Sequence, residues 1–343
     1  MTSRARQNSF TQTHPKDRRA RHAPRVFVAA LLLAEACGPA ATDGAKTPTV
    51  SAAPAQAPAP VIHVVTGSTA GLSVNGYLVE GRAGVVAVDS ALTVSDGKAL
   101  RARLDAIGKP LLAVLLTHGH PDHYNGVSAL VAGRSDVPVY ATAAVSRVIR
   151  EYDAKKEAQW KPMFGAEWPM TRTFPNHELE AGATLEIDGL KWTVRGVGPG
   201  ESHADTYWVL EAAKRYAFVG DIVLHGEHAY VADGHTTAWL GTLHRLHDDL
   251  ANVSTLYPGH GAAGGRELLD WEEEYLTAYR AEVDHLRQGA TISEADKKVL
   301  ESKMKERYPK AGLEFMIALG ADAEAAELAG SHGPNPLQAG GSK

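Results

Sequence analysis

Three histidines and an aspartate lie within one short segment, residues 117–123, which reads Thr-His-Gly-His-Pro-Asp-His. The apolar run at residues 110–116, directly before this cluster, is predicted to form a strand. His118 and His120 are two positions apart, so an extended backbone turns both imidazoles to the same side. The spacing therefore predicts that these two side chains bind one metal ion.

A second pair of possible ligands follows within the same segment. Pro121 stiffens the turn, and Asp122 and His123 stand at the head of a predicted helix, displaced from the first pair. Two adjoining metal sites are the natural interpretation of this arrangement. The alternative, four polar residues on a solvated loop, is disfavoured because further histidines and aspartates follow downstream.

The pattern His-x-His-x-Asp-His after an apolar strand resembles that of the metallo-β-lactamase superfamily. Four further residues match the landmarks of this family in the expected order: Asp89, His203, Asp221 and His260. Together the matches span residues 61–265. The resemblance implies an α/β fold, an αββα sandwich of two mixed β-sheets flanked by helices, with the metal site at one edge of the sandwich.

The resemblance also implies a role for each matching residue. One metal is expected on His118, His120 and His203, the other on Asp122, His123 and His260, with Asp221 bridging the two. Asp122 is in addition the expected catalytic residue, which steers the nucleophile or carries a proton to the leaving group. Asp205 and Thr206 are expected to orient His203, and Asp89 is expected to brace loops.

A ligand set of imidazoles and carboxylates without a thiolate suits two Zn²⁺ ions, and it equally admits iron or manganese. Two adjacent cations lower the pKa of the water that they share, so that a bridging hydroxide is available as the nucleophile at neutral pH. The same ions polarise the oxygen of an acyl or phosphoryl group. The predicted activity is therefore metal-dependent hydrolysis.

The elements that must position these residues follow an α/β pattern over residues 61–290, the predicted catalytic domain. Short apolar runs bounded by glycine predict strands at 61–65, 71–79 and 84–88, and helical apolar spacing predicts a helix at 95–107. This alternation places ligands at strand ends, where irregular backbone can aim them.

Residues 141–175 are a possible lid insertion. After a predicted helix at 143–156 come five large apolar side chains, in a segment interrupted by proline and glycine: Trp160, Met163, Phe164, Trp168 and Met170. Such a segment either closes a substrate pocket as a lid or wall, or packs its aromatic rings against the core. We favour the lid, because aromatic side chains in irregular segments often line pockets.

The run at 222–234 holds three candidate substrate-binding residues: His225, His228 and Tyr230. They either face the mouth of the site or pack beneath a helix, and their types and spacing do not decide between the two. Further on, helical patterns cover residues 237–247 and 267–286. A helical tail with a disordered end, residues 291–343, is expected to complete the chain and carries no motif.

The first 36 residues are predicted to direct export. They hold seven basic and two acidic residues, and their apolar run of nine residues at 26–34 is too short for a permanent transmembrane helix. Cys37, the only cysteine, follows this run as the lipid-modified cysteine of a lipoprotein does, although Glu35 fits that signal poorly. Simple cleavage nearby and a misassigned start are the alternatives to a lipid anchor. The expected location is the periplasm, free or membrane-anchored.

Residues 37–60 are rich in alanine and proline and are expected to form a disordered tether. Residues 1–36 carry a charge of +5 and the whole chain carries −5, so the remainder carries −10. This acidic balance argues against a nucleic-acid partner. A small-molecule substrate is expected instead, and no pattern indicates an oligomeric state.

The favoured function is that of an exported dinuclear zinc hydrolase acting on an ester, lactone, thioester or related acyl bond. With an aspartate at position 221, the sequence resembles the glyoxalase-II-like thioesterases, acyl-homoserine lactonases and phosphodiesterases of this fold. β-Lactam-cleaving members with a cysteine at that position have a lysine where Leu224 stands here. β-Lactam and phosphodiester hydrolysis are the alternatives. An iron-dependent oxygenase and a noncatalytic binding protein are less favoured, the latter because no expected ligand is missing.

Overall fold

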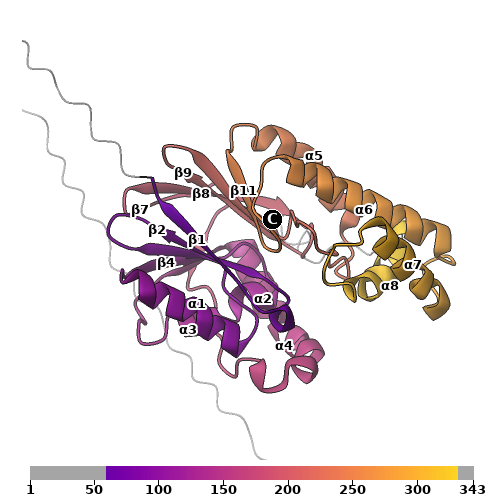
Figure 1. Cartoon of the computed structure of the whole chain (residues 1–343), viewed down its shortest axis with the longest axis horizontal. Coiled ribbons are helices and arrows are strands. Elements are labelled where there is room, and N and C mark those ends of the chain that lie inside the picture. The colour runs from indigo at the N-terminus through magenta and orange to yellow at the C-terminus, as the bar shows by residue number, and fades with distance from the viewer. Residues whose placement is uncertain (1–58, 331–343) are drawn as a thin grey trace, which may run out of the picture. The chain divides into compact units, whose positions relative to one another are not determined.

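The computed structural model describes residues 59–330. The predicted export segment, Cys37, residues 331–343 and nearly all of the predicted tether lie outside this range and stay predictions. Within the described range, no helix combines the length and the apolar character that crossing a membrane requires. The described residues form two β-sheets with helices packed against them (Figure 1).

The first sheet has six strands in the order β1-β2-β3-β4-β5-β6. They are β1 (Val61–Thr66), β2 (Asn75–Glu80), β3 (Val85–Val88), β4 (Leu111–Leu115), β5 (Val139–Thr142) and β6 (His177–Leu179). The strands β1, β2 and β3 pair antiparallel, whereas β3 through β6 pair parallel. The sheet is therefore mixed. The strands predicted at 61–65 and 84–88 are confirmed, whereas the strand predicted at 71–79 begins only at Asn75, after a 3₁₀ turn.

The second sheet has five strands in the order β11-β10-β9-β8-β7. They are β7 (Thr184–Ile187), β8 (Leu190–Gly198), β9 (Asp205–Glu211), β10 (Arg215–Gly220) and β11 (Thr255–Pro258). All pairs are antiparallel except β10 with β11, which is parallel. Between β7 and β8, Asp188 and Gly189 have φ angles of 54° and 73°, as a tight hairpin turn requires.

The two sheets pack face to face through large side chains. Tyr77 and Val88 of the first sheet share a buried cluster with Trp192, Trp208 and Phe218 of the second. The rings of Tyr77 and Phe218 meet edge to face with centroids 5.2 Å apart. Because side chains alternate along a strand, the neighbours of these residues point to the outer faces, which must be covered in turn.

Helices cover both outer faces, as Figure 1 shows. The first sheet carries α1 (Val94–Ile107), α2 (Pro121–Tyr124), α3 (Val127–Leu130) and α4 (Ala143–Phe164), with short 3₁₀ turns at Thr69–Gly71 and Gly165–Glu167. The second sheet carries α5 (Thr236–Asp249), α6 (Glu267–Leu286), α7 (Glu294–Arg307) and α8 (Met316–Leu328). Each set of helices shares a buried core with its own sheet. The αββα sandwich is confirmed.

The helix α4 is longer than predicted, because it continues past residue 156 and through Pro162. Proline removes one backbone hydrogen bond from a helix, but Pro162 lies in the last turn, where few bonds depend on it. Trp160 and Phe164 are four residues apart and lie on one face, with ring centroids 6.4 Å apart. The start of the segment expected to be irregular is therefore helical.

The C-terminal helices share a core with the sheets. Leu300 of α7 and Ile317 of α8 pack in one cluster with Tyr275 and Tyr279 of α6. The Tyr279 hydroxyl also donates a hydrogen bond to the Ile317 carbonyl oxygen at 2.6 Å. Tyr275 and Tyr279 of α6, both fully buried, are therefore core residues. The domain boundary predicted before this tail stays a prediction, although its helices pack on α6.

Candidate metal centre

The histidine-rich loop leaves the end of β4 and is held there by Asp89, which follows β3. The Asp89 carboxylate accepts hydrogen bonds from the Thr117 backbone N–H at 2.8 Å and from the Thr117 hydroxyl at 2.7 Å. Asp89 has a φ of 55°, a left-handed conformation that aspartate adopts more readily than most residues. These contacts confirm the expectation that Asp89 braces a loop.

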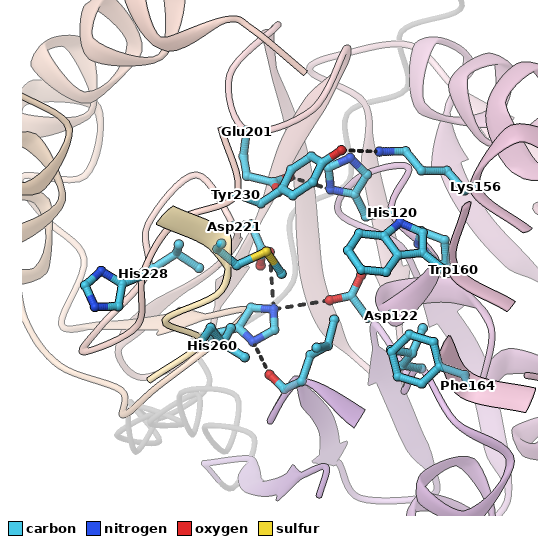
Figure 2. A pocket seen from close by; sticks show the side chains of 16 residues that line it. His120, Asp122, Lys156, Trp160, Phe164, Glu201, Asp221, His228, Tyr230 and His260 are labelled. Atoms are coloured by element: carbon cyan, nitrogen blue, oxygen red, sulfur yellow. Dashed lines mark hydrogen bonds and ion pairs between the residues drawn. The ribbon is translucent and has the colours of Figure 1, made fainter. Parts of the chain in front are cut away.

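Four buried side chains form one compact cluster, the four-residue group: Asp122, His123, Asp221 and His260. Their ligand-type atoms all lie within 4.8 Å of one another. His123 Nε2 is 3.2 Å from Asp221 Oδ1. His260 Nε2 is 3.2 Å from Asp122 Oδ2 and 3.3 Å from Asp221 Oδ2, and Figure 2 shows it between these two carboxylates.

Hydrogen bonds from outside orient both imidazoles of the four-residue group. His123 Nδ1 lies 2.9 Å from Asp89 Oδ2, and His260 Nδ1 lies 2.9 Å from the Leu72 carbonyl oxygen. An acceptor at Nδ1 fixes the ring hydrogen there, so Nε2 turns its lone pair toward the carboxylates. This is the orientation of histidines that bind a cation.

Two glycines allow the loop after β11 to bring His260 into this group. A Cβ atom on Gly259 would collide with the Asp221 carboxylate, and one on Gly261 would collide with the backbone of His225. Gly261 also has a φ of 85°, which favours glycine. Neither position therefore accepts a side chain without displacing its neighbours.

A second buried cluster, the three-residue group, consists of His118, His120 and Glu201. Glu201 Oε2 lies 3.3 Å from His118 Nε2 and 2.8 Å from His120 Nδ1. On the outer side, His118 Nδ1 is 3.1 Å from Thr117 Oγ1, and His120 Nε2 is 3.0 Å from Asp233 Oδ2. The inner ring nitrogens again face a carboxylate.

We expected His203 to lie beside His118 and His120. The structure places Glu201 there instead. His203 Nδ1 lies 2.7 Å from His235 Nε2, and its Nε2 lies 3.8 Å from Asp233 Oδ2. The same oxygen, Asp233 Oδ2, also contacts His120 Nε2. Asp233 therefore links His203 to the three-residue group.

The turn between β8 and β9 explains why Glu201, and not His203, lies beside these two histidines. The Asp205 carboxylate accepts hydrogen bonds from the backbone N–H and from the hydroxyl of Ser202, both at 3.0 Å. In this closed turn Glu201, before Ser202, contacts His118 and His120, whereas His203, after it, contacts His235 and Asp233. The side chain that reaches the histidine-rich loop is therefore the glutamate.

Asp205 and Thr206, expected to orient His203, form their hydrogen bonds with other residues than the His203 side chain. Asp205 bonds to Ser202, and the Thr206 hydroxyl donates to the Thr117 carbonyl oxygen at 2.6 Å. Sequence reasoning also missed Glu201, although a signal was present. This glutamate lies two residues before His203 in the same matched loop, and a carboxylate is as ordinary a ligand for zinc as an imidazole.

Burial and mutual charge set the pKa values of the centre. Burial raises the pKa of the Glu201 carboxyl to about 7 and lowers the pKa of His118 well below its usual range. Burial also opposes ionisation of Asp221, but His123 and His260 hold the pKa of its carboxyl well below its usual range. The two groups gather three carboxylates and four imidazoles in one buried region, where bound cations would compensate the acidic charge.

Four buried polar atoms of the two groups form no regular hydrogen bond and contact ligand-type atoms of their own group instead: His118 Nε2, His123 Nε2, Glu201 Oε2 and Asp221 Oδ1. Such atoms are rare in protein interiors because burying them without a partner costs free energy. Each faces other ligand-type atoms of its own group, so one cation in each group would satisfy all four. Nitrogen and oxygen donors without sulfur fit zinc, manganese or iron.

The two groups meet a pocket with about 530 Å³ of empty space, part of it open to solvent (Figure 2). Five ligand-type residues form its floor: His120, Asp122, Glu201, Asp221 and His260. Its walls are mainly apolar: Leu72, Leu92, Trp160, Phe164, Leu224, Leu313 and Met316. A pocket of this size and character suits a small molecule.

Of the three predicted substrate-binding residues, His228 and Tyr230 line the pocket and His225 does not. His225 Nδ1 instead bonds to the Ala262 carbonyl oxygen at 3.0 Å, and its ring lies edge-on to Trp271 at 6.3 Å. His225 is thus a loop residue that packs on a helix. Substrate binding by His228 and Tyr230 stays a prediction.

Sequence reasoning missed Lys156 of α4, which lines the pocket. Its Nζ donates to the Tyr230 hydroxyl oxygen at 3.0 Å and to Asp233 Oδ1 at 3.2 Å, and Figure 2 shows the first of these contacts. The Tyr230 hydroxyl donates in turn to Asp233 at 3.1 Å. A helix lysine usually faces water, and only contacts distant in sequence bury this one.

The aromatic segment divides between pocket wall and core. Trp160 and Phe164 line the pocket, whereas Trp168 is buried in the adjoining apolar cluster. Met163 and Met170 are 65% and 82% exposed. The segment therefore supplies part of a wall and part of the core, and its movement as a lid stays a prediction.

Comparison with known proteins places the chain in a family. A sequence model of the metallo-beta-lactamase superfamily matches residues 69–260, more than half of the 343 residues. Two relatives are both named metallo-beta-lactamase type 2. The one from Bacillus sp. (strain 170) is 22% identical over 203 residues, which cover 57% of this chain and 69% of the relative. The one from Bacillus cereus is 22% identical over 218 residues, which cover 61% and 75%.

Solved structures share the fold. A metallo-beta-lactamase family protein from Thermus thermophilus aligns with a TM-score of 0.56 at 23% identity, over 80% of this chain and 96% of that one. The members of the superfamily that the sequence resembles are metal-dependent hydrolases. The chain belongs to the metallo-beta-lactamase superfamily and is a metal-dependent hydrolase.

Proposed function

We propose that the protein is an exported dinuclear zinc hydrolase that cleaves an ester, lactone, thioester or related acyl bond of a small molecule. One observation carries the proposal: two buried groups of nitrogen and oxygen donors, four of whose atoms form no regular hydrogen bond, adjoin a pocket with apolar walls. In the proposal each group holds one ion. When bound, the ions supply a hydroxide nucleophile at neutral pH and polarise the acyl oxygen.

The side chains of the protein orient the substrate and move protons. Asp122 contacts His260 through Oδ2 at 3.2 Å and lines the pocket, and in the proposal its carboxylate steers the nucleophile or carries a proton to the leaving group. Asp221 contacts both imidazoles of the four-residue group and is the residue that we propose to bridge the ions. The apolar walls exclude bulk water from the scissile bond.

Zinc is the proposed metal because mixed imidazole and carboxylate ligands without thiolate are common at catalytic zinc. Glu201 adds an oxygen donor to the three-residue group, which keeps manganese and iron as alternatives. Elemental analysis of protein purified without added metal tests this choice. Two zinc ions per chain would support the proposal, whereas bound iron with oxygen-dependent turnover would favour the oxygenase.

The names of the two relatives favour β-lactam hydrolysis as a second candidate function. A β-lactam is an acyl compound, and attack on its carbonyl carbon would use the same centre. Leu224 argues against it, because an apolar side chain lines the pocket where a lysine would hold the carboxylate of the drug. Phosphodiester cleavage is the third candidate.

A substrate panel tests the proposed activity. Zinc-loaded protein is given a lactone, an ester, a thioester, a phosphodiester and a β-lactam, with His118→Ala as the control. We expect the acyl compounds other than the β-lactam to be cleaved fastest, and the variant to lose turnover by about 10³-fold. Preference for the β-lactam or the phosphodiester would overturn the proposed substrate class.

Export is proposed from residues 1–36, which precede the described range. Expression of the full-length chain in a bacterial host, followed by cell fractionation, tests it. Processed protein outside the cytoplasm is the expected result, and an unprocessed cytoplasmic chain would contradict it. In the same experiment, Cys37→Ser should move the protein from the membrane to the soluble fraction if Cys37 carries a lipid.

A further inference from the structure

We propose that the substrate carries an uncharged, apolar group beside the scissile bond, and that Phe164, Leu313 and Met316 set the size of this group. The proposal rests on the proposed hydrolase function and adds the substrate class. That class is a neutral ester or lactone with a hydrocarbon or aromatic substituent, and the residues that select it come from α4 and from the C-terminal segment.

The apolar side of the pocket is a continuous surface built from distant parts of the chain. Leu72, Leu92, Trp160 and Met316 belong to one buried cluster, against which Phe164 and Leu313 pack as partly buried members. All six residues line the pocket. Water against such a surface has few hydrogen-bond partners, so an apolar group that displaces it gains free energy.

The pocket offers no uncompensated cation of its own. Lys156 is the only lysine or arginine among the described residues that line it. Its ammonium lies 3.2 Å from the Asp233 carboxylate, and both side chains are at most 10% exposed. The remaining imidazole of the wall, His228, is neutral at pH 7 because burial lowers its pKa to about 4.

A carboxylate on the substrate would therefore bind poorly in the part of the pocket that lies away from the metal ions. It would lose its hydration on entering the apolar side of the pocket, and this loss is large for an unpaired charge. To pair with Lys156 it would have to displace Asp233, which would leave that aspartate buried without its partner. A neutral substituent meets neither cost.

The C-terminal part of the wall is fixed in place and can therefore select by size. Gly312, next to Leu313, bonds through its N–H to the Gly226 carbonyl oxygen at 3.0 Å and accepts from the His228 N–H at 2.9 Å. Further along α8, Glu324 accepts a hydrogen bond from the Thr236 hydroxyl at 2.7 Å. These contacts hold α8 and the preceding loop against the loop after β10 and the start of α5.

Binding of alkanohydroxamates to the zinc-loaded protein tests the proposal without requiring turnover. The hydroxamate chelates the metal, and its tail reports on the pocket. We expect the Kd to fall about fourfold for each added CH₂ until the pocket is full. A hydroxamate of equal length that ends in a carboxylate should bind at least about 100-fold more weakly.

Variants assign the selection to named residues. For a tail that fills the pocket of the parent protein, Met316→Ala should raise the Kd about fivefold. In this variant the Kd should also go on falling with added CH₂ groups beyond the length at which the parent pocket is full. Leu319→Ala is the matched control, because Leu319 lies on the same helix, is 36% exposed and does not line the pocket. Phe164→Ala, with the exposed neighbour variant Met163→Ala as its control, repeats the test on α4.

The outcomes separate this inference from the function on which it rests. Equal or tighter binding of the carboxylate-ended hydroxamate would overturn the inference and leave the hydrolase intact. Unchanged length dependence in both Met316→Ala and Phe164→Ala, with melting temperatures near that of the parent, would overturn the assignment to these residues. If no hydroxamate bound and no acyl substrate were cleaved, the proposed function and the inference would both fall.

Discussion

The imidazoles of the four-residue group are held from outside by a loop-bracing carboxylate, Asp89, and by a main-chain carbonyl, that of Leu72, each at 2.9 Å. In the three-residue group, His120 is held by Asp233, which is itself paired with Lys156 of the pocket wall. The first kind of support comes from Asp89, which follows β3, and from the main chain of Leu72, a residue that also lines the pocket. The second depends on two side chains, those of Asp233 and Lys156.

This difference teaches that the two groups should not respond alike to mutation. Support from Asp89 is shared with the backbone of the histidine-rich loop, so its loss disturbs both the fold and the metal. Support from Asp233 connects the wall residue Lys156 directly to a candidate ligand. Changes in the pocket wall should therefore reach metal binding mainly at the three-residue group.

The largest expected effect distinguishes Glu201 from His203. Glu201→Ala removes the only carboxylate of the three-residue group, so bound zinc should fall from two ions to one and turnover by about 10³-fold. His203→Ala, the control from the same loop, should keep two ions and most of the activity. Metal analysis and steady-state kinetics measure both, and the opposite pattern would restore His203 as the ligand.

Asp89→Ala should have the next largest effect. It removes the acceptor of the Thr117 N–H, the Thr117 hydroxyl and His123 Nδ1. We expect metal affinity to fall about 10- to 100-fold and the free energy of unfolding, measured with urea, to fall by about 2–4 kcal/mol.

Asp188→Ala is the matched control for Asp89→Ala. Asp188 also has a left-handed φ, of 54°, and accepts a hydrogen bond from the Ala83 N–H at 2.7 Å, in a turn outside the centre. It should leave metal affinity unchanged. Equal effects of the two substitutions on metal binding would refute the special role of Asp89.

Asp233→Asn tests the support that comes from the pocket. The amide cannot pair with the Lys156 ammonium or fix the His120 ring as a carboxylate does, so one of the two zinc ions should bind about tenfold more weakly. The other ion should keep its affinity. Competition with a chromophoric chelator resolves the two steps, and equal weakening of both would contradict the division between the groups.

The smallest effect is expected for Thr206→Val. Its hydroxyl bonds to the Thr117 carbonyl oxygen at 2.6 Å, but its backbone N–H donates to the same oxygen at 3.0 Å. Stability should fall by about 1 kcal/mol, while metal affinity changes less than twofold because the loop stays in place. A large loss of metal would show that this hydroxyl has a role which the backbone bond does not replace.

Short-range spacing was sufficient to predict most of the centre. His118, His120, Asp122 and His123 lie in one loop, and the strand before them directs that loop to a sheet edge. Asp221 and His260 were expected from the family resemblance, and each lies directly after a strand or within a glycine-bounded loop. For these residues, local backbone decides where the side chain points.

The two misses have different physical causes, one within a short turn and one between residues distant in sequence. Glu201 and His203 lie in one turn, and the bonds of Asp205 to Ser202 decide which of the two faces the histidines. Lys156 is buried by Asp233, 77 positions away. No periodicity in the sequence encodes such partners.

Anomalous X-ray diffraction at the zinc edge, on crystals of the zinc-loaded protein, tests the central claim most directly. We expect two peaks about 3.5–4 Å apart. One should lie about 2 Å from a Glu201 carboxylate oxygen, and the other should lie at a similar distance from His123 and His260. A single peak, or a peak coordinated by His203 with Glu201 turned away, would contradict the account.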